Sequence, residues 1–209
     1  MSTPPDPRAR WEDRYSGVDG YLYGTEPNDF LAETIDASGP IGTALCIADG
    51  EGRNGVHLAA LGHTVTSVDL TEAGMAKARR LADERNVELT TVVSDIDDHD
   101  LGTSRWDLIV SIFAHMPPPI RRRLHARIAD ALTPDGRFVL EAYTPDQVGR
   151  GTGGPPDTAL TMTLAGLREE LSGLEIVHGA ELVRPVIEGP GHTGDGAVVQ
   201  VIARRADAG

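Results

Sequence analysis

The sequence is poor in cysteine and has no long apolar segment. One cysteine, Cys46, stands among 209 residues, so no disulfide can form within the chain. A membrane-spanning helix needs about 20 successive apolar residues, whereas the apolar runs here end after a few. The polar, proline-rich N-terminus lacks the apolar core of a signal peptide. We therefore expect a cytoplasmic protein with no membrane partner, and we expect residues 1–10 to be disordered.

Positive charge is scarce as well. The 19 lysines and arginines stand against 32 aspartates and glutamates, which gives a formal net charge of −13. Nucleic-acid binding draws most of its affinity from neutralised phosphates, so an acidic chain predicts no nucleic-acid partner. The one dense basic run, Arg121-Arg122-Arg123, lies on a predicted helix beside the apolar residues Leu124 and Ile128. We interpret this run as a solvated helix face. The oligomeric state stays open.

Strand-like and helix-like patterns alternate from residue 43 onward. The strand patterns lie at 43–48, 64–69, 89–93, 106–112 and 137–143. Helical patterns lie at 54–61, after the capping residue Thr71, and at 120–132, with a turn at 134–136. Such alternation is typical of a parallel sheet with right-handed crossovers. A last helix is expected at 164–171. Two strand patterns follow, at 174–186 and 197–204, joined by a glycine-rich loop at 188–196, which predicts an antiparallel hairpin.

A glycine-rich motif, Gly50-Glu51-Gly52-Arg53-Asn54-Gly55, lies between the first strand and the first helix. Glycines there let the backbone approach a ligand, and the helix N-terminus presents free N–H groups. Asp69 ends the second strand, where a carboxylate can accept both hydroxyls of a ribose. Asp95 ends the third strand, where a carboxylate can meet an adenine amino group. All three features lie at carboxyl ends of neighbouring strands, where open α/β sheets bind ligands.

The charges of the loop help to choose the cofactor. Asp49 and Glu51 flank Gly50. The pyrophosphate of a dinucleotide would lie against both carboxylates, and like charges about 4 Å apart repel by roughly 1 kcal/mol in water and more inside a protein. S-adenosylmethionine instead carries an ammonium and a sulfonium group, which these carboxylates would attract. The loop therefore favours S-adenosylmethionine over NAD.

Four segments resemble the successive cofactor motifs of class I S-adenosylmethionine-dependent methyltransferases. They are Leu45–Asn54, Val65–Leu70, Ser94–Ile96 and Asp107–Ser111. The Gly-Arg-Asn run from Gly52, and the upstream segment Trp11–Tyr15, are similar to the tellurite-resistance and thiopurine methyltransferase branch. The resemblance implies a Rossmann-like, seven-stranded, mainly parallel sheet with an antiparallel C-terminal strand, in the order 3-2-1-4-5-7-6.

The resemblance also implies one methyltransferase domain over residues 1–209. Its parts would be an N-terminal cofactor-covering segment at 11–40, a cofactor-binding core at 41–146, and a substrate loop, helix and terminal hairpin at 147–209. Residue roles follow by the same resemblance. The methionine part would be lined by Asp49, Gly50, Gly52, Asn54 and Ser111, the ribose and adenine held by Asp69, Leu70, Asp95 and Ile96, and the cover formed by Trp11, Arg14, Tyr23 and Gly24. The family usually has an acid and a glycine where this chain has Cys46 and Ala48, which weakens the expectation of ammonium recognition.

Candidates for catalysis and substrate binding are fewer. His115 follows the fourth strand, where a neutral histidine could accept a proton from a nucleophile, or could contact the cofactor or cap the next helix. Tyr143, Arg150 and His192 are candidate substrate contacts. The glycine-rich stretch at 149–156 is a mobile lid or a plain connection. No histidine spacing or acidic loop matches a metal site.

The expected function is methyl transfer from S-adenosylmethionine to a small molecule by in-line displacement, with S-adenosylhomocysteine as product. A soft sulfur, selenium or tellurium nucleophile, or an oxygen, would suit a site without an obvious base. Two alternatives stay open: an NAD-dependent oxidoreductase and a non-catalytic S-adenosylmethionine-binding protein.

Overall fold

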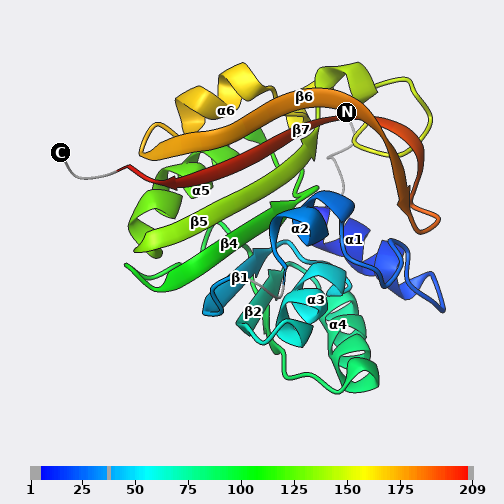
Figure 1. Cartoon of the computed structure of the whole chain (residues 1–209). Coiled ribbons are helices and arrows are strands. Elements are labelled where there is room, and N and C mark those ends of the chain that lie inside the picture. The colour runs from blue at the N-terminus through cyan, green and yellow to red at the C-terminus, as the bar shows by residue number, and fades with distance from the viewer. Residues whose placement is uncertain (1–5, 37–38, 207–209) are drawn as a thin grey trace.

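The computed structural model describes residues 6–36 and 39–206, which form a twisted sheet with helices on both faces (Figure 1). The sheet has seven strands in the order β3-β2-β1-β4-β5-β7-β6. They are β1 (Thr43–Ile47), β2 (Thr64–Asp69), β3 (Thr90–Val93), β4 (Trp106–Ile112), β5 (Leu132–Tyr143), β6 (Leu174–Glu188) and β7 (His192–Arg205). Strands β1 to β5 pair in parallel, and β7 runs antiparallel to both of its neighbours. The predicted fold class and strand order are confirmed.

Most of the helices begin at polar capping residues. The helices are α1 (Pro7–Ser16), α2 (Asp29–Thr34), α3 (Arg53–Ala60), α4 (Glu72–Arg85), α5 (Pro118–Ala131) and α6 (Leu164–Glu170), with short 3₁₀ turns η1 (Pro145–Gln147) and η2 (Thr158–Leu160). Asn28, Thr71 and Thr163 each accept a hydrogen bond from the first turn of α2, α4 and α6. Within residues 6–36 and 39–206, no helix is long and apolar enough to cross a bilayer.

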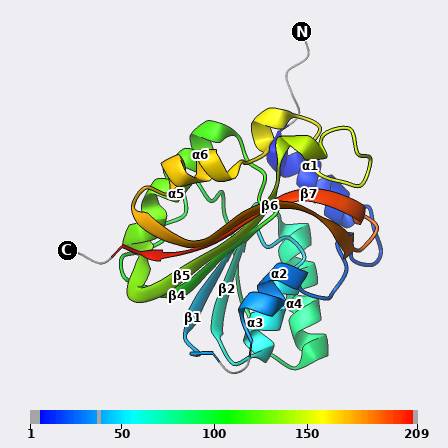
Figure 2. The ribbon, with the colours of Figure 1, turned by 45° about the horizontal axis from the view of Figure 1, so that its top comes forward.

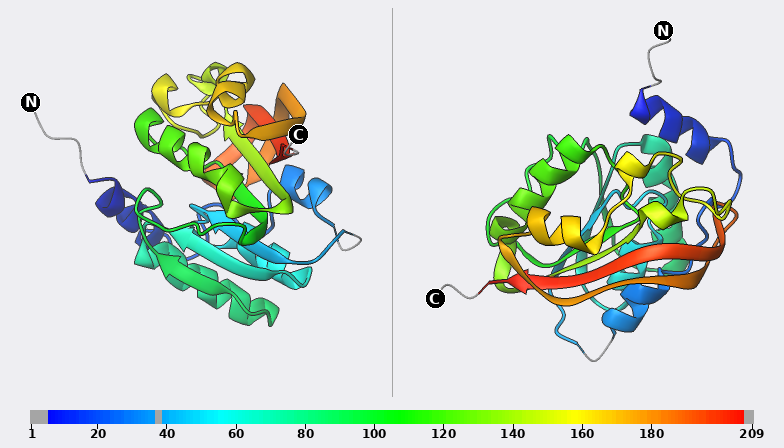
Figure 3. Two further views of the ribbon diagram at one scale, coloured as in Figure 1. Left: turned by 90° about the vertical axis from the view of Figure 1, so that its left-hand side faces the viewer. Right: turned by 90° about the horizontal axis from the view of Figure 1, so that it is seen from above.

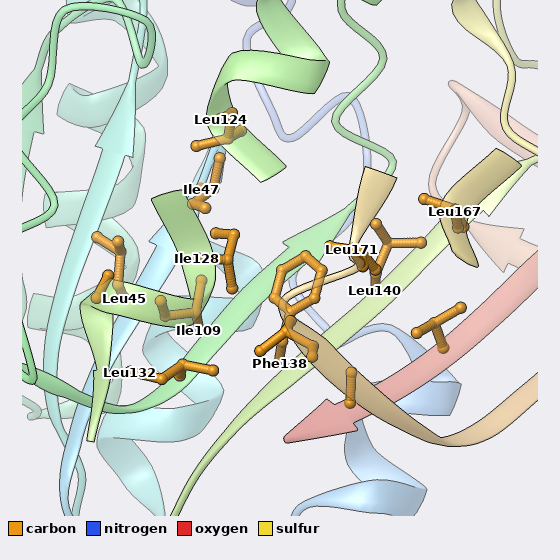
Figure 4. Packing of buried hydrophobic residues seen from close by; sticks show 14 of the residues in the cluster. Leu45, Ile47, Ile109, Leu124, Ile128, Leu132, Phe138, Leu140, Leu167 and Leu171 are labelled. Atoms are coloured by element: carbon orange, nitrogen blue, oxygen red, sulfur yellow. The ribbon is translucent and has the colours of Figure 1, made fainter. Parts of the chain in front are cut away.

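Alternate residues of the central strands supply two apolar cores, because successive side chains of a strand point to opposite faces. In β1, Leu45 and Ile47 belong to the core under α5 and α6, whereas Ala44 and Cys46 belong to the core under α2 and α3. Figure 2 shows these helix pairs on opposite sides of the sheet, and Figure 4 shows Ile128 of α5 within the first core. Cys46 is buried in β1.

The N-terminal boundary differs from the expectation. Residues 7–10 belong to α1, so the prediction of disorder there was wrong; residues 1–5 lie outside the described part of the chain. Asp6 caps the helix by accepting from the backbone N–H of Arg8. The Arg8 guanidinium in turn donates to the carbonyl of Leu70 at 2.6 Å. These local and long-range bonds order a stretch whose composition is typical of disorder.

Two later boundaries also differ. Strand β5 begins at Leu132 rather than at residue 137, because Leu132 pairs with Trp106 before the register shifts. The predicted turn at 134–136 therefore lies within the bounds of β5. Strand β7 begins at His192, so the expected loop at 188–196 shortens to residues 189–191.

The basic run on α5 is not the solvated face that the sequence suggested. Arg121 is buried, and its guanidinium donates to the Glu170 carboxylate at 2.8 Å and to the carbonyl of Thr161 at 3.2 Å. Helix α6 brings Glu170 over α5, which periodicity within α5 alone could not reveal. Arg122 and Arg123 are exposed, as expected.

Candidate functional site

The glycine loop joins β1 to α3 in a left-handed conformation. Ala48, Gly50 and Gly52 have φ angles of 50°, 58° and 86°. Glycine adopts such angles freely, while for alanine they cost roughly 1 kcal/mol or more. A Cβ on Gly50 would lie 2.5 Å from the Tyr15 hydroxyl, and a Cβ on Gly52 would lie 2.4 Å from the Cβ of Ala78. The loop is therefore held between α1 and α4 with no room for side chains.

Asp69, at the end of β2, lies against this loop as predicted. Its carboxylate accepts hydrogen bonds from the backbone N–H of Gly50 at 3.0 Å, and from the N–H and hydroxyl of Thr71 at 3.0 and 2.7 Å. Burial raises the pKa of Asp69, and these hydrogen bonds oppose the rise. Each carboxylate oxygen can accept more than one hydrogen bond. The Asp69 carboxylate can thus still receive the hydroxyls of a ribose beside the loop.

The carboxylates of the two other acids of the loop bind groups within the fold, which the interpretation of the loop's charges did not anticipate. The Asp49 carboxylate accepts from the Ser67 hydroxyl at 2.6 Å and from the N–H of Gly55 at 3.2 Å, and burial raises its pKa to about 7. The Glu51 carboxylate bonds Lys77 at 2.8 Å and the N–H of Leu22 at 2.7 Å. Glu51 is thus paired with a cation inside the fold, whereas Asp49 has only neutral hydrogen-bond donors.

Three further predicted cofactor residues have structural partners. The Asn54 side chain is buried and accepts from the N–H of Asn28 at 3.0 Å, so it ties α3 to the N-terminal segment rather than facing a ligand. Asp95 accepts from the N–H of Asp97 within its own turn. The carbonyl of Ile96 accepts from Arg127 of α5 at 2.8 Å.

The remaining core residues stand where the strands end. Leu70 follows Asp69 directly and is half-buried. Ser111 is buried in β4, opposite Ile47 of β1. Because β1 and β4 are neighbours, Ser111 lies below the strand end from which the glycine loop leaves. The structure thus brings Gly50, Asp69 and Ser111 to one edge of the sheet.

The predicted covering segment is fixed over this edge. Trp11 stacks on Tyr15 at 5.5 Å between ring centroids, and the Arg14 guanidinium lies 4.8 Å from the Trp11 ring and donates to the Tyr23 hydroxyl. The Glu12 carboxylate accepts from two backbone N–H groups in the first turn of α4, at 3.0 Å each. Helix α1 is therefore tied to the N-terminus of α4, where a negative charge is favourable.

The hairpin of β6 and β7 reaches the same segment. The N–H of Gly191 donates to the carbonyl of Leu22 at 2.9 Å, and a Cβ on Gly189 would lie 2.5 Å from the backbone nitrogen of Gly24. Figure 3 shows the tip of this hairpin beside the N-terminal segment. Gly24 has a φ of 72°, which only this crossing of two backbones explains.

Five rings gather next to the glycine loop, at the carboxyl ends of β4 and β5. We call this set the aromatic cluster; it consists of Tyr23, Phe113, His115, Tyr143 and His192. Phe113 stacks on Tyr143 at 4.5 Å, and His115 lies 5.5 Å from Tyr143 with an interplanar angle of 11°. His192 packs edge-on against Phe113 and Tyr143 and lies 4.5 Å from Tyr23. Four distant segments of sequence thus build one ring-lined surface.

His115 belongs to this cluster with a defined hydrogen-bonding state. Its Nδ1 lies 3.0 Å from the carbonyl of Leu160, so Nδ1 carries the proton and Nε2 is left as an acceptor. Within the described chain, Nε2 is buried without a partner. Burial lowers the pKa of His115 to about 4. The predicted base is therefore a neutral histidine with a free lone pair, and it does not cap α5.

The three predicted substrate contacts do not all lie together. Tyr143 and His192 pack against each other, whereas Arg150 is exposed and donates to the carbonyl of Asp146. The stretch at 149–156 is anchored, because the Gln147 amide donates to the carbonyl of Gly153 at 2.9 Å. This contact favours a plain connection over a mobile lid.

Phe113 is a site residue that sequence reasoning missed. It follows β4 with a φ of 51°, which is uncommon for a bulky residue and is typical of strained functional positions. Its N–H donates to the carbonyl of Glu141 at 2.7 Å, which holds the turn in place. No sequence signal marks such a residue, because its conformation arises from neighbouring strands.

A buried charge network behind the cluster was missed as well. Arg184 of β6 donates to both oxygens of Glu141 and to Glu188, while Glu188 also pairs with Arg53 at 2.5 Å. Glu141 is fully buried, and the Asn28 amide bridges it to Glu188 at 2.9 Å each. Although burial alone would lower it, the pKa of Arg184 is raised by these carboxylates. Among the described residues, no group of three histidines, cysteines or acids is arranged to hold a metal ion.

Comparisons with known proteins agree with this geometry. Residues 44–136 match the family model described as a methyltransferase domain. A TehB-like S-adenosylmethionine-dependent methyltransferase from Corynebacterium glutamicum superposes with a TM-score of 0.61 at 24% identity, over 95% of each chain. No curated protein matches the sequence significantly.

Two other solved structures are similar over nearly the whole chain. One comes from work on the conversion of a disulfide bond into a thioacetal group during echinomycin biosynthesis, with a TM-score of 0.78, 20% identity, and coverage of 96% of this chain and 92% of that one. The other is the 1,6-didemethyltoxoflavin-N1-methyltransferase from Burkholderia thailandensis with bound S-adenosylhomocysteine (TM-score 0.64, 20% identity, 99% and 94% coverage). Residues 44–136 are thus a methyltransferase domain, set in a chain that has the Rossmann-like fold of S-adenosylmethionine-dependent methyltransferases.

Proposed function

We propose that this protein transfers a methyl group from S-adenosylmethionine to a small-molecule acceptor by in-line displacement. One observation carries the proposal: the glycine loop with Asp69 and the aromatic cluster with His115 meet at the same edge of the sheet. Because β1 and β4 are neighbours, the methionine end of a cofactor on the loop would point toward the cluster. The described N-methyltransferase from Burkholderia thailandensis acts on a small molecule, which supports a small acceptor.

The residues present fit such a cofactor. When bound, S-adenosylmethionine supplies a methyl group on a positively charged sulfur. Asp69 would hold the ribose, and the left-handed backbone of Gly50 and Gly52 would allow close approach. Tyr15, buried against Gly50, and Trp11 would keep water from the reacting groups. Alignment of reactants in such a site contributes roughly 7–11 kcal/mol to catalysis.

The free Nε2 of His115 bears on the nature of the nucleophile. The sequence favours a soft sulfur, selenium or tellurium nucleophile only because it shows no evident base. An unpartnered Nε2 beside the cofactor loop removes that reason, since it offers an acceptor for a proton. A soft nucleophile remains one proposal, and an oxygen nucleophile gains support.

The proposal is tested by replacing Asp69 with alanine. The substitution should weaken the binding of S-adenosylhomocysteine about 100-fold or more, because two hydrogen bonds to a charged acceptor are lost. Calorimetric titration measures the affinity, with NAD as a parallel ligand. Asp107→Ala is the matched control, since Asp107 is the second residue of β4, at the end of the strand away from the glycine loop, where it accepts from the N–H of Thr43.

Each contrary result has a definite meaning. Wild-type affinity in Asp69→Ala would sink the assignment of the ribose site. Binding of NAD instead of S-adenosylhomocysteine would favour the oxidoreductase. Tight binding of S-adenosylhomocysteine, without its release when S-adenosylmethionine is offered with candidate acceptors, would favour a non-catalytic protein.

A further inference from the structure

Two rings of the aromatic cluster carry polar atoms that the fold does not satisfy. Tyr143 is 0% exposed and His192 is 7% exposed. Among residues 6–36 and 39–206, the Tyr143 hydroxyl and Nδ1 of His192 have no hydrogen-bond partner; the nearest carboxylate, Glu188, lies 3.7 Å from Nδ1. Buried polar groups are nearly always paired, so several unpaired atoms gathered in one cluster call for a partner from outside the chain, such as water or a ligand. With Nε2 of His115, three such atoms lie in one cluster.

Glycines press against these rings and fix them. A Cβ on Gly154 would lie 2.9 Å from Cδ2 of Tyr143, and a Cβ on Gly191 would lie 2.5 Å from Cε1 of Tyr23. Backbone therefore covers the outer sides of these rings. The glycine-rich stretches at 149–156 and 188–196, which the sequence indicates as loops, thus pack against the rings of the aromatic cluster and hold them in place.

The polar atoms of the cluster define a complementary ligand. Nε2 of His115 can only accept, because Nδ1 donates to the carbonyl of Leu160. Burial raises the pKa of Tyr143 well above its ordinary value, so its hydroxyl stays protonated and is able to donate. A single hydroxyl group on a ligand can give its proton to the histidine and accept from the tyrosine. Phe113, which is partly buried, stacks on Tyr143 with one ring face, and its other face would be the one for a ligand ring.

We propose that the methyl acceptor is a planar aromatic ring with an acidic hydroxyl group, stacked on Phe113 and held between Nε2 of His115 and the hydroxyl of Tyr143. The proposal rests on the proposed function. In the transfer, a lone pair of the acceptor oxygen forms the bond to the methyl carbon. The bond from that carbon to sulfur breaks, and its electron pair stays on the sulfur. The hydroxyl proton passes to Nε2 of His115.

Chemistry around the cluster favours this acceptor over a small oxyanion. The walls are ring faces, which an oxyanion does not need and which strip it of water. Arg150 donates to the carbonyl of Asp146, and Arg53 and Arg184 are already paired with Glu188, so none of these three cations is free to bind an anion. A buried histidine with a lowered pKa is a weak base, which suits only a hydroxyl that is itself acidic.

Binding of two matched ring compounds, measured by calorimetric titration, tests the proposal without relying on turnover. 7-Hydroxycoumarin carries the planar ring and an acidic hydroxyl, and coumarin is the same ring without it. Each is titrated into the protein with and without saturating S-adenosylhomocysteine. We expect the wild type to bind 7-hydroxycoumarin with about tenfold or more higher affinity than coumarin. A site that hydrogen-bonds a hydroxyl leaves its own polar groups unpaired when the ligand lacks that hydroxyl. Tyr143→Phe and His115→Gln should each lose most of this preference while still binding coumarin.

Controls separate recognition from folding. His63→Gln changes a histidine that bonds the N–H of Gly42 near the start of β2, far from the cluster, and should keep the preference. Thermal unfolding of each variant checks that it is folded. With S-adenosylmethionine present, His115→Gln should form methylated product from 7-hydroxycoumarin about 100-fold more slowly or worse, with little change in coumarin binding.

The outcomes distinguish the two proposals. Equal binding of both probes by the wild type, binding of neither, or an undiminished preference in Tyr143→Phe overturns the proposed acceptor. Retained binding of S-adenosylhomocysteine in those cases would leave the proposed function standing. If the wild-type protein does not bind S-adenosylhomocysteine, the proposed function is overturned.

Discussion

Replacing Arg184 with leucine should lower the free energy of unfolding by about 3–5 kcal/mol. Arg184 is the cation shared by Glu141 and Glu188, whose side chains are 0% and 3% exposed. Leucine fills much of the space but leaves the buried Glu141 carboxylate without its cation, while Glu188 keeps Arg53. Urea unfolding followed by circular dichroism measures the loss.

A matched variant separates buried charge from strand position. Arg204 of β7 pairs with Glu175 at 2.7 Å, but both side chains are about half exposed. Arg204→Leu should therefore cost no more than about 1 kcal/mol. Adding Glu141→Gln to Arg184→Leu should recover part of the stability, because one orphaned charge disappears. A loss for Arg184→Leu as small as that for Arg204→Leu would refute the importance of the network.

Replacing Asp49 with asparagine should stabilise the protein, and the gain should grow with pH. The folded pKa of Asp49 is raised to about 7 from an ordinary value of 3.8, mainly by burial. The folded state therefore holds this proton more tightly than the unfolded state, and the carboxyl lowers stability increasingly as pH rises from about 4 to about 7. The advantage of Asp49→Asn should increase by roughly 3 kcal/mol between pH 4.5 and pH 8. Unfolding curves at both pH values give this difference.

Asp107 provides a control of opposite sign. Its folded pKa is lowered, first of all by the backbone N–H of Thr43, so its contribution to stability is present above the unfolded pKa and lost as the pH falls. Asp107→Asn should be less stable than the wild type at pH 8, with a deficit that shrinks in acid. A pH-independent effect of Asp49→Asn would show that the Asp49 carboxyl is not strained by burial.

The sheet could be predicted from sequence because the patterns that indicate its strands are local. Strand β4, with Leu108, Ile109 and Val110, is apolar on both faces, which marks a central parallel strand. The glycine loop and Asp69 could be placed because they follow such strands directly. The helix after Thr71 could be placed because Thr71 is a capping residue, which marks the start of a helix.

Side-chain direction in loops could not be predicted. Asp49 and Glu51 flank a glycine of the loop in sequence, yet Ser67 and Lys77 draw their carboxylates into the fold. Asn54 is likewise turned to a partner 26 residues away. In a loop no periodicity decides which face a side chain takes, so charge near a motif is weak evidence about a ligand.

The residues proposed to bind the methyl acceptor were harder still to predict, since the contacts between them join distant parts of the chain. Tyr23 meets His192, and Asn28 meets Glu188 across 160 residues of sequence. Such contacts follow from the strand order, which places β6 and β7 at one edge, and not from any short pattern. His115 and Tyr143 were found because each lies at a strand end, whereas Phe113 owes its place to a strained turn.

The contact between Tyr23 and His192 has a consequence for the order of assembly. A chain is synthesised from its N-terminus, and early segments begin to fold first. Strands β1 to β4 can gather while the ribosome is still adding residues, but His192 begins the last strand of the sheet. A nascent chain therefore has its cofactor loop before its aromatic cluster, and the proposed acceptor surface is complete only when β7 has inserted between β5 and β6.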